Sequence, residues 1–428
     1  MLLGSAVGCS APSSSGHQSK VSETPNYTAY YTYPNAGGNR FLPNANMNLL
    51  ADSTGVAKVD LPGVPIWLVS VRTNETVAWV VSLQDGTLMA FRWDQGNLLP
   101  LDLPIESLRP GMPPTVVVSG SGEISIANTL VGDMGPATAP TLIGRDTLRL
   151  AYINDKRELV VREENGSMQM LPVNALSDTR IVLDGDTMAL LTDPATYDHA
   201  ALGNMEEPTT VSMVRAEPQL ELTSKIELPE AVVMEAVSPL WADVTGDDEA
   251  EIVVTLANTP ESRGAAIAVF TRRGDLLAMG QLSPGGWRHL LGVAPIGPAG
   301  EIEIVDIQKP HVQKIVNFYR PNGEVLDIVA HATSYSSHNS GSTNIYMSLM
   351  GDFDGDSSNI ELLVPDADKR LMKILARRLE GKVDVLGSLD PGGVLSTNFS
   401  WIASEHESFF AIGTESKELR IWYSKKVQ

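Results

Sequence analysis

An acidic, oxygen-rich loop in the stretch MSLMGDFDGDSSNIELLVPD holds the side chains of this chain that are best suited to chemistry. The stretch covers residues 347–366, and its loop lies between two apolar runs that alternate as strands do. A second version, PLWADVTGDDEAEIVVTL at residues 239–256, places Asp243 where the first has Asp352. Clustered carboxylates can transfer protons in catalysis or bind a metal ion. Because the loop occurs twice, we interpret it as part of a repeating strand-loop-strand unit.

The elements that position these loops recur along the chain. Runs rich in Val, Ile and Leu are separated by turns that contain glycine, such as DQG at 94–96, ENG at 164–166, RGD at 273–275 and PNG at 321–323. Such turns are typical of β-hairpins. Units of about fifty residues, each with four short strands and no long helical pattern, predict a β-propeller rather than a sandwich or a solenoid.

The period predicts an all-β fold with seven four-stranded blades in one propeller domain, residues 49–428. The expected blades span residues 65–104, 138–172, 179–226, 239–282, 287–329, 344–389 and 398 onwards. A turn is expected near Glu217-Pro218 in the third blade. The last blade is one strand short, and we expect the segment Val56–Gly63 to pair with it and close the ring. If the insertion TVVVSGSGEISIANTLV is itself a blade, the count becomes eight.

The two acidic loops resemble the FG-GAP or VCBS repeat of integrin α-subunit propellers and many bacterial surface proteins. Loops of that family follow the pattern D-x-D-G-D-x-x-x-D, in which oxygens at alternate positions face one cation. The ligands that the resemblance implies for the later loop are Asp352, Asp354, Asp356 and, displaced by one residue, Glu361. Those that it implies for the earlier loop are Asp243, Thr245, Asp247 and Glu251. Calcium prefers about six to eight hard oxygen ligands, so the later loop, with more carboxylates, is the stronger candidate.

A calcium ion in such a loop would be structural rather than catalytic. It would stiffen the loop, whereas catalysis needs an activated water with an acid or base that converge on a substrate. The alternative is that both loops are polar turns, in which Asp and Gly end the strands without a metal.

The rest of the sequence indicates no enzyme. It contains no G-x-S-x-G, H-E-x-x-H or G-x-x-x-x-G-K-[ST] motif and no cysteine nucleophile. The histidines are scattered, and His331, His338 and His406 share no ligand spacing. The polar stretch His331–Tyr346 could bind a glycan or a protein, or it could be an ordinary surface loop.

Composition narrows the possible partners. The 52 acidic and 31 basic residues give a net charge of -21, which argues against binding to nucleic acid or to an anionic membrane surface. Among the 428 residues no apolar run approaches the length of a transmembrane helix. The single cysteine, Cys9, excludes an internal disulfide and a multi-cysteine metal site.

The residues around Cys9 resemble the lipobox of bacterial lipoprotein signals. A short apolar run ends in small residues directly before this cysteine, and a stretch rich in Ser and Pro follows it. The resemblance implies that residues 1–9 are a signal remnant, that Cys9 carries a lipid, and that the protein lies in the cell envelope. Ser10 favours sorting to the outer membrane. Ala6 in place of the usual Leu departs from the pattern, and a lone cysteine in a disordered tail is the alternative.

Residues 10–48 are expected to form a tether followed by an arm rich in Tyr and Asn. Pro and Gly interrupt the arm, so we expect it to be extended and packed on the propeller, although its aromatic rings could instead stack on a sugar or a partner. Two functions follow. The first is a lipid-anchored, non-enzymatic envelope propeller that binds another envelope or surface protein, with structural calcium. The second is a propeller that binds or hydrolyses glycans with paired carboxylates near its channel.

Overall fold

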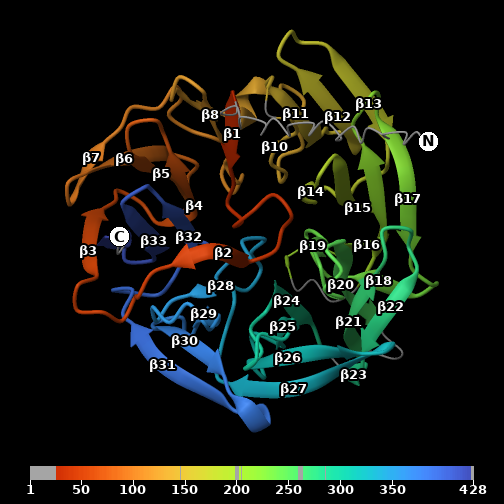
Figure 1. Cartoon of the computed structure of the whole chain (residues 1–428). Coiled ribbons are helices and arrows are strands. Elements are labelled where there is room, and N and C mark those ends of the chain that lie inside the picture. The colour runs from red at the N-terminus through yellow and green to blue at the C-terminus, as the bar shows by residue number, and fades with distance from the viewer. Residues whose placement is uncertain are drawn as a thin grey trace, which may run out of the picture.

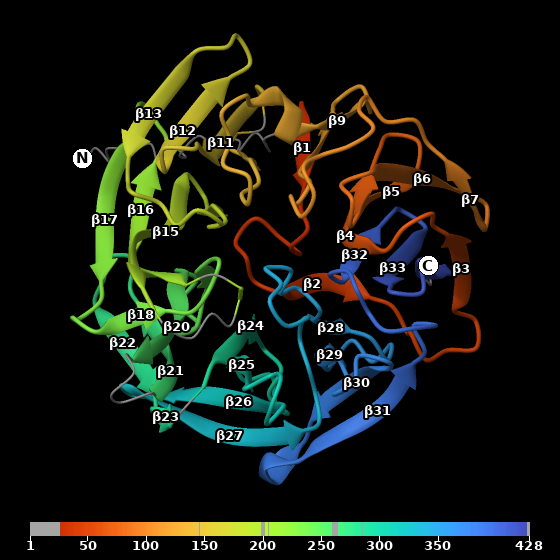
Figure 2. The ribbon, with the colours of Figure 1, turned by 180° about the vertical axis from the view of Figure 1, so that it is seen from behind.

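The computed structural model describes residues 26–144, 146–197, 202–203, 205–258, 264–284 and 286–425. Within these ranges the regular structure is β-strand, apart from two single-turn 3-10 helices, Ala127–Leu130 and Leu379–Gly381. No helix of this part of the chain is long and apolar enough to cross a membrane. The strands form mainly antiparallel sheets arranged in a ring, which is a β-propeller (Figure 1; Figure 2). Cys9 and the tether lie outside the described residues.

Seven units of the ring follow the expected blades in chain order. The first unit contains β4 (Pro65–Arg72), β5 (Val77–Leu83), β6 (Leu88–Asp94) and β7 (Asn97–Pro100). The second contains β10 (Thr141–Leu142), β11 (Arg149–Ile153), β12 (Glu158–Glu163) and β13 (Met168–Pro172). The third contains β14 (Val182–Asp184), β15 (Thr187–Thr196), β16 (Glu206–Arg215) and β17 (Glu221–Glu227). The turn expected at Glu217-Pro218 is confirmed, because it falls between β16 and β17.

The fourth and fifth units belong to one ten-stranded sheet, because their outer strands β22 and β27 pair in parallel. The fourth contains β18 (Val232–Met234), β19 (Leu240–Ala242), β20 (Glu251–Asn258), β21 (Gly264–Phe270), β22 (Leu276–Gly280) and β23 (Ser283–Pro284). The fifth contains β24 (Arg288–Ala294), β25 (Glu303–Gln308), β26 (Ile315–Asn322) and β27 (Val325–Thr333). The last two contain β28 (Leu349–Asp352), β29 (Glu361–Pro365), β30 (Met372–Arg377) and β31 (Val383–Leu389), then β32 (Ser400–Ala403), β33 (Glu407–Thr414) and β34 (Glu418–Lys425).

The ring closes as the sequence predicted. Strand β3 (Gly55–Asp60) pairs antiparallel with β34, so that Val56 lies opposite Trp422 and Asp60 lies opposite Glu418. This pairing supplies the missing outer strand of the last blade and joins the C-terminal strand to a segment that precedes the first blade.

The insertion after the first blade forms a further sheet, so the strand pairing of the described residues gives eight units instead of seven. Its own strands are only β8 (Val116–Ser119) and β9 (Ile124–Ile126), and β1 (Tyr27–Tyr30) of the arm pairs antiparallel with β8. The sequence around the insertion contains only two of the three strands of this sheet, so it does not show the four-strand pattern of a blade. The third strand, β1, comes from a distant part of the chain. The pairing therefore agrees with the alternative count.

Large apolar side chains fill the spaces between neighbouring blades. Trp79, Trp93 and Phe409 meet between the first and the last blade, with the rings of Trp79 and Phe409 edge to face at 5.4 Å. Phe353 and Phe410 lie in the corresponding cluster between the sixth and the last blade. Burial of one such side chain contributes about 1.5–3 kcal/mol, so these clusters hold adjacent blades together.

The N-terminal arm runs through the central channel instead of lying outside the ring (Figure 1). After β1, which contacts β4 and β10, the backbone oxygen of Ala36 accepts a hydrogen bond from Leu183, and that of Gly37 accepts one from Trp241. The arm then forms β2 (Phe41–Asn46), which pairs in parallel with β28. The paired region therefore begins well before residue 49.

Candidate metal centre and central channel

The sixth-blade loop connects β28 to β29, and a glycine allows its tight turn. Gly355 has a φ of 86°, a backbone conformation that residues with a Cβ rarely adopt. Asp352 ends β28 and Glu361 begins β29, and the adjacent pairing of Gly351 with Glu361 brings the two ends of the loop together. The strand pairing thus places two carboxylates that are nine positions apart in the sequence side by side.

Three carboxylates converge in this loop. Asp352, Asp354 and Glu361 can each offer one oxygen such that all three oxygens lie within 4.8 Å of one another. Asp352 is 4% exposed and Glu361 is fully buried. One oxygen of each is held in place: Asp352 Oδ1 accepts from Gly355 N at 2.8 Å and Glu361 Oε2 accepts from Phe353 N at 2.8 Å. Their other oxygens, Oδ2 and Oε1, are buried and have no hydrogen-bond donor.

This arrangement fits a hard divalent cation. Burial, together with the nearby Asp354 and Asp352 charges, raises the pKa of Glu361 to about 7. Burial is also the largest cause of the raised pKa of Asp352. Buried, fixed and unpaired carboxylate oxygens are costly without a counter-charge, and a calcium ion would supply one.

Asp356, the remaining expected ligand, is not part of this group. Its Oδ1 accepts from the Ser358 hydroxyl at 2.7 Å, and its Oδ2 accepts from Asn359 Nδ2 at 2.9 Å. The hydrogen bonds from Ser358 lower the pKa of Asp356. Its carboxylate therefore holds the outer part of the turn together.

The fourth-blade loop uses the same residue types differently. Asp243 accepts backbone hydrogen bonds with both oxygens, from Gly246 N at 2.6 Å to Oδ1 and from Asp248 N at 3.0 Å to Oδ2. Glu251 Oε2 accepts from Val244 N at 2.8 Å, which matches the bond made by Glu361. Asp247 accepts from Glu249 N at 3.0 Å. In the described chain, Asp243, Thr245, Asp247 and Glu251 do not form a convergent carboxylate group.

The arm lies directly beside the sixth-blade loop. Met47 N donates to the backbone oxygen of Asp352 at 3.0 Å, and Leu49 N donates to that of Phe353 at 2.9 Å. A Cβ at Gly355 would lie 3.1 Å from Asn48, and one at Gly351 would lie 2.7 Å from the Cβ of Ala45. The loop and the arm are therefore one packed unit.

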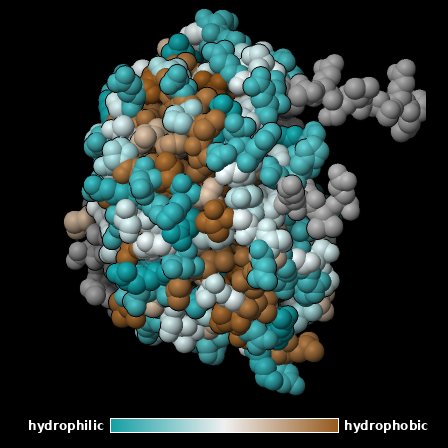
Figure 3. All heavy atoms as spheres, turned by 90° about the vertical axis from the view of Figure 1, so that its left-hand side faces the viewer, coloured by the Kyte–Doolittle hydropathy of each residue, from teal (hydrophilic) through white to brown (hydrophobic). Residues whose placement is uncertain are grey.

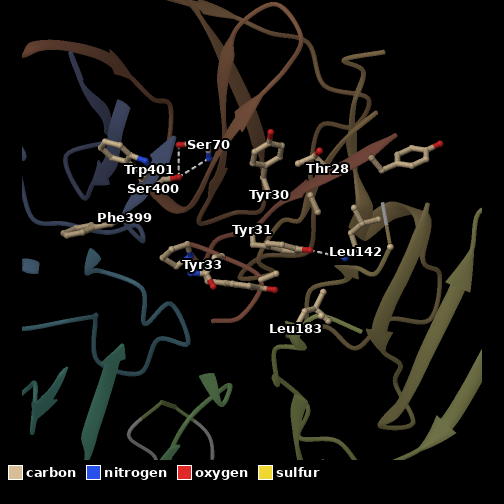
Figure 4. Close-up of a pocket in the computed structure, with 17 residues that line it drawn as sticks. Thr28, Tyr30, Tyr31, Tyr33, Ser70, Leu142, Leu183, Phe399, Ser400 and Trp401 are labelled. Carbon is tan, nitrogen blue, oxygen red and sulfur yellow. Dashed lines mark hydrogen bonds between the residues drawn. The ribbon is translucent and has the colours of Figure 1, made fainter. Parts of the chain in front are cut away.

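A cavity of about 570 Å³ remains in the channel beside the arm (Figure 4). Tyr31 and Tyr33 stack in it with ring centroids 4.8 Å apart, and Leu142 N donates to the Tyr31 hydroxyl at 3.1 Å. Burial raises the pKa of both tyrosines, which keeps their hydroxyl groups protonated. The described residues that line the cavity include no acidic, basic or histidine side chain.

A second hollow, of about 1110 Å³, lies between the first and the last blade. Trp93 and Tyr423 form its aromatic part, with ring centroids 4.5 Å apart. Trp93 Nε1 donates to Glu407 Oε2 at 2.9 Å. The hollow thus combines aromatic side chains with polar groups that are held by hydrogen bonds. Neither the repeat pattern nor the acidic loops of the sequence predicted this hollow.

Three histidines that are scattered in the sequence are brought together by the fold. His289, His311 and His338 come from three separate segments of the fifth blade and its connections, and each of the other two rings contacts that of His338. The spacing of these histidines in the sequence did not predict the contact between their rings. The contact depends on how the β25–β26 and β27–β28 connections fold over β24.

No protein-family model matches the chain, and no curated protein matches it either. The resemblance to the FG-GAP repeat therefore rests on the loop residues alone. Among solved structures, the chain is similar to BamB from Moraxella catarrhalis, with 9% identity, a TM-score of 0.34, and coverage of 86% of this chain and 98% of that one. It is also similar to the β-propeller domain of Cps50 (Swd1) from Myceliophteria thermophila, with 10% identity, a TM-score of 0.44 and the same coverage. Both similarities are too distant to indicate a function.

Proposed function

We propose that this protein is a non-enzymatic β-propeller that serves as a protein-interaction scaffold or complex subunit in the bacterial cell envelope. The lipobox-like residues around Cys9 support anchoring by a lipid, with Ser10 favouring the outer membrane. The partner is another envelope or surface protein.

The observation that carries this proposal is the filled channel. In a propeller enzyme the channel must admit a substrate and present acid and base groups to it. Here the arm occupies the channel, and the remaining cavity is lined, in the described chain, by tyrosines and other uncharged side chains. That leaves the rim and the outer surface for binding.

The outer surface suits a protein partner. Figure 3 shows one side of the ring, on which apolar side chains gather in patches between polar ones. The outer strands of neighbouring blades contribute exposed apolar residues, such as Val56 on β3 at 50% and Val385 on β31 at 52%. Apolar patches rimmed by polar groups are typical of protein interaction sites.

A single structural calcium ion is part of the proposal. Asp352, Asp354 and Glu361 would hold it, and backbone oxygens or water would complete its coordination. Because Met47 and Leu49 bond to the same loop, the ion would also hold the arm in the channel.

The experiment is purification of the intact protein from membranes of its native host, beside a Cys9→Ala variant. The proposal expects lipid incorporation at Cys9 and one partner protein in fixed stoichiometry with the wild-type chain. A wild-type protein that carries no lipid and copurifies with no protein would refute it.

Glycan binding is the second candidate function, and the hollow between the first and the last blade favours it. An aromatic surface beside a carboxylate, as Trp93, Tyr423 and Glu407 provide, is a suitable platform for a sugar. Titration with envelope oligosaccharides would support this candidate if binding were lost in Tyr423→Ala, and absence of binding would remove it.

A further inference from the structure

Two histidines in connections of the fifth blade, His311 and His338, contact each other through their ring nitrogens. His311 lies in the connection between β25 and β26, and His338 lies in the connection between β27 and β28. Their Nε2 atoms are 3.1 Å apart. His338 is fully buried, whereas His311 is half-buried and can be reached from solvent.

The third histidine, His289, is not available as a ligand. Arg40 NH2 lies 2.9 Å from its Nε2, and because a guanidinium only donates, this nitrogen must accept. The other ring nitrogen, Nδ1, then carries the hydrogen and donates to Ser337 Oγ at 2.5 Å. Both nitrogens of His289 are therefore used in positioning the arm and Ser337.

The same chain of contacts leaves the two Nε2 atoms facing each other. Ser337 Oγ lies 3.4 Å from His338 Nδ1, so the serine reaches only the far side of that ring. The rings of His311 and His338 are inclined by 61° with centroids 4.5 Å apart. If each Nε2 pointed straight at the other, the distance between the ring centroids would be the 3.1 Å between the nitrogens plus the radii of both rings. That sum is larger than the observed centroid distance. The two rings are therefore inclined to the line that joins the nitrogens, and the 3.1 Å separation is the measure of whether one ion could contact both.

An imidazole binds a metal ion in its neutral form. Burial, together with neighbouring cationic groups such as Arg40 and Lys369, lowers the pKa of His338 to about 2. Burial is also the main cause of the lowered pKa of His311, with Lys369 and Lys314 contributing.

We propose that His311 and His338 form a two-imidazole site for a borderline divalent transition-metal ion such as Cu²⁺, Ni²⁺ or Zn²⁺. Bonds of about 2.0–2.1 Å from one ion to two nitrogens, at angles between square and tetrahedral, place those nitrogens roughly 3 Å apart. Water completes the coordination. In this state the hydrogen of His338 lies on Nδ1 and is donated to Ser337 Oγ, which fixes the ring.

The surroundings determine which ions bind and how strongly. Imidazole favours Cu²⁺ over Ni²⁺ and Zn²⁺ and has little affinity for Ca²⁺, so this site and the acidic loop take different ions. Lys369 and Lys314 repel a cation, but Lys314 Nζ is held by the backbone oxygen of Ala367 at 2.8 Å. Repulsion from Lys369 makes the site weaker than two imidazoles alone would be.

The test is titration of the intact protein with Cu²⁺, Ni²⁺ and Zn²⁺ in saturating Ca²⁺, which occupies the acidic loop. We compare His311→Gln with His331→Gln, which removes an exposed histidine. The site predicts a Kd at least tenfold weaker in His311→Gln and changed less than twofold in His331→Gln. The paramagnetic resonance spectrum of bound Cu²⁺ should show two coupled ring nitrogens in the wild type and one in His311→Gln.

A second variant keeps the proposal testable if His311→Gln folds poorly, which circular dichroism would show. Lys369→Met removes the nearby charge and should tighten Cu²⁺ binding several-fold. Equal affinities in the wild type and His311→Gln, or a Cu²⁺ spectrum unaltered by that substitution, would overturn the proposal. So would an unchanged affinity in Lys369→Met where His311→Gln cannot be measured.

Discussion

The acidic loops of the fourth and the sixth blade share a sequence pattern but differ in what their carboxylates do. In the fourth blade both oxygens of Asp243 accept backbone hydrogen bonds. In the sixth, Asp352 and Glu361 each keep one buried oxygen without a donor, and Asp354 lies beside them. In the first loop the carboxylate oxygens of Asp243 are used as in a polar turn, whereas the second loop keeps two buried oxygens that a cation could contact. Similar spacing therefore does not imply the same chemistry.

The arm contributes to this difference. It runs beside the sixth-blade loop, where Gly351 leaves space for Ala45. The equivalent residue in the fourth blade is Ala242, which precedes Asp243 as Gly351 precedes Asp352. Met47 and Leu49 of the arm also bond to the backbone of Asp352 and Phe353, so the arm packs directly against this loop.

Removal of calcium by a chelator should produce the largest difference in stability between the two loops. Removing calcium should lower the melting temperature of the wild type, because a ligand at 100 times its Kd stabilises the folded state by about 2.7 kcal/mol. Calorimetry in calcium and in chelator measures the shift. Glu251→Gln should retain it and Glu361→Gln should lose it. An unchanged wild-type melt would contradict the metal assignment.

The two turn glycines provide a second contrast. Gly355 and Gly246 have φ values of 86° and 80°, so an alanine at either position costs about 1–2 kcal/mol of backbone strain. Gly355→Ala should destabilise the protein more, because its Cβ would lie 3.1 Å from Asn48, whereas at Gly246 the nearest atom, in Ile302, is 3.7 Å away. Denaturant unfolding of both variants measures the difference. Equal losses would show that the arm does not press on the sixth-blade loop.

Asp356→Asn should have a smaller effect. Its carboxylate accepts hydrogen bonds only within the exposed part of the turn, from Ser358 and Asn359. An asparagine keeps an acceptor there, so calcium affinity should fall by less than about threefold, as befits a weak surface electrostatic change. Calcium titration measures it, and a loss as large as that of Glu361→Gln would make Asp356 a ligand.

Thr245→Asp should have the smallest effect. It restores the family pattern in the fourth-blade loop, but the oxygens of Asp243 remain bonded to the backbone. We expect no second calcium ion in this variant at millimolar calcium. Appearance of a second site by titration would show that ligand count, rather than the use of each oxygen, distinguishes the loops.

The sequence predicted much of the ring because local signals determine it. Alternating apolar runs and glycine turns gave the strands of most blades, and Val56–Gly63 resembled an outer strand closely enough to predict its pairing with β34. The eighth unit was harder to predict, since β8 and β9 depend on β1 for a third strand. The path of the arm through the channel was not predictable, because it depends on contacts with several blades at once.

The candidate sites follow the same division. The family resemblance of the loop identified Asp352, Asp354 and Glu361, but it did not show that the carboxylate of Asp356 is bonded to Ser358 and Asn359 instead of joining them. The pair His311 and His338 left no pattern in the sequence. Its two side chains lie on separate connections, and only packing brings their Nε2 atoms to 3.1 Å.

Calcium titration of the intact protein beside Glu361→Gln and Glu251→Gln tests the central claim most directly. The account predicts one calcium ion per wild-type chain, one in Glu251→Gln and none in Glu361→Gln. Two ions in the wild type, or loss of binding in Glu251→Gln with retention in Glu361→Gln, would contradict it.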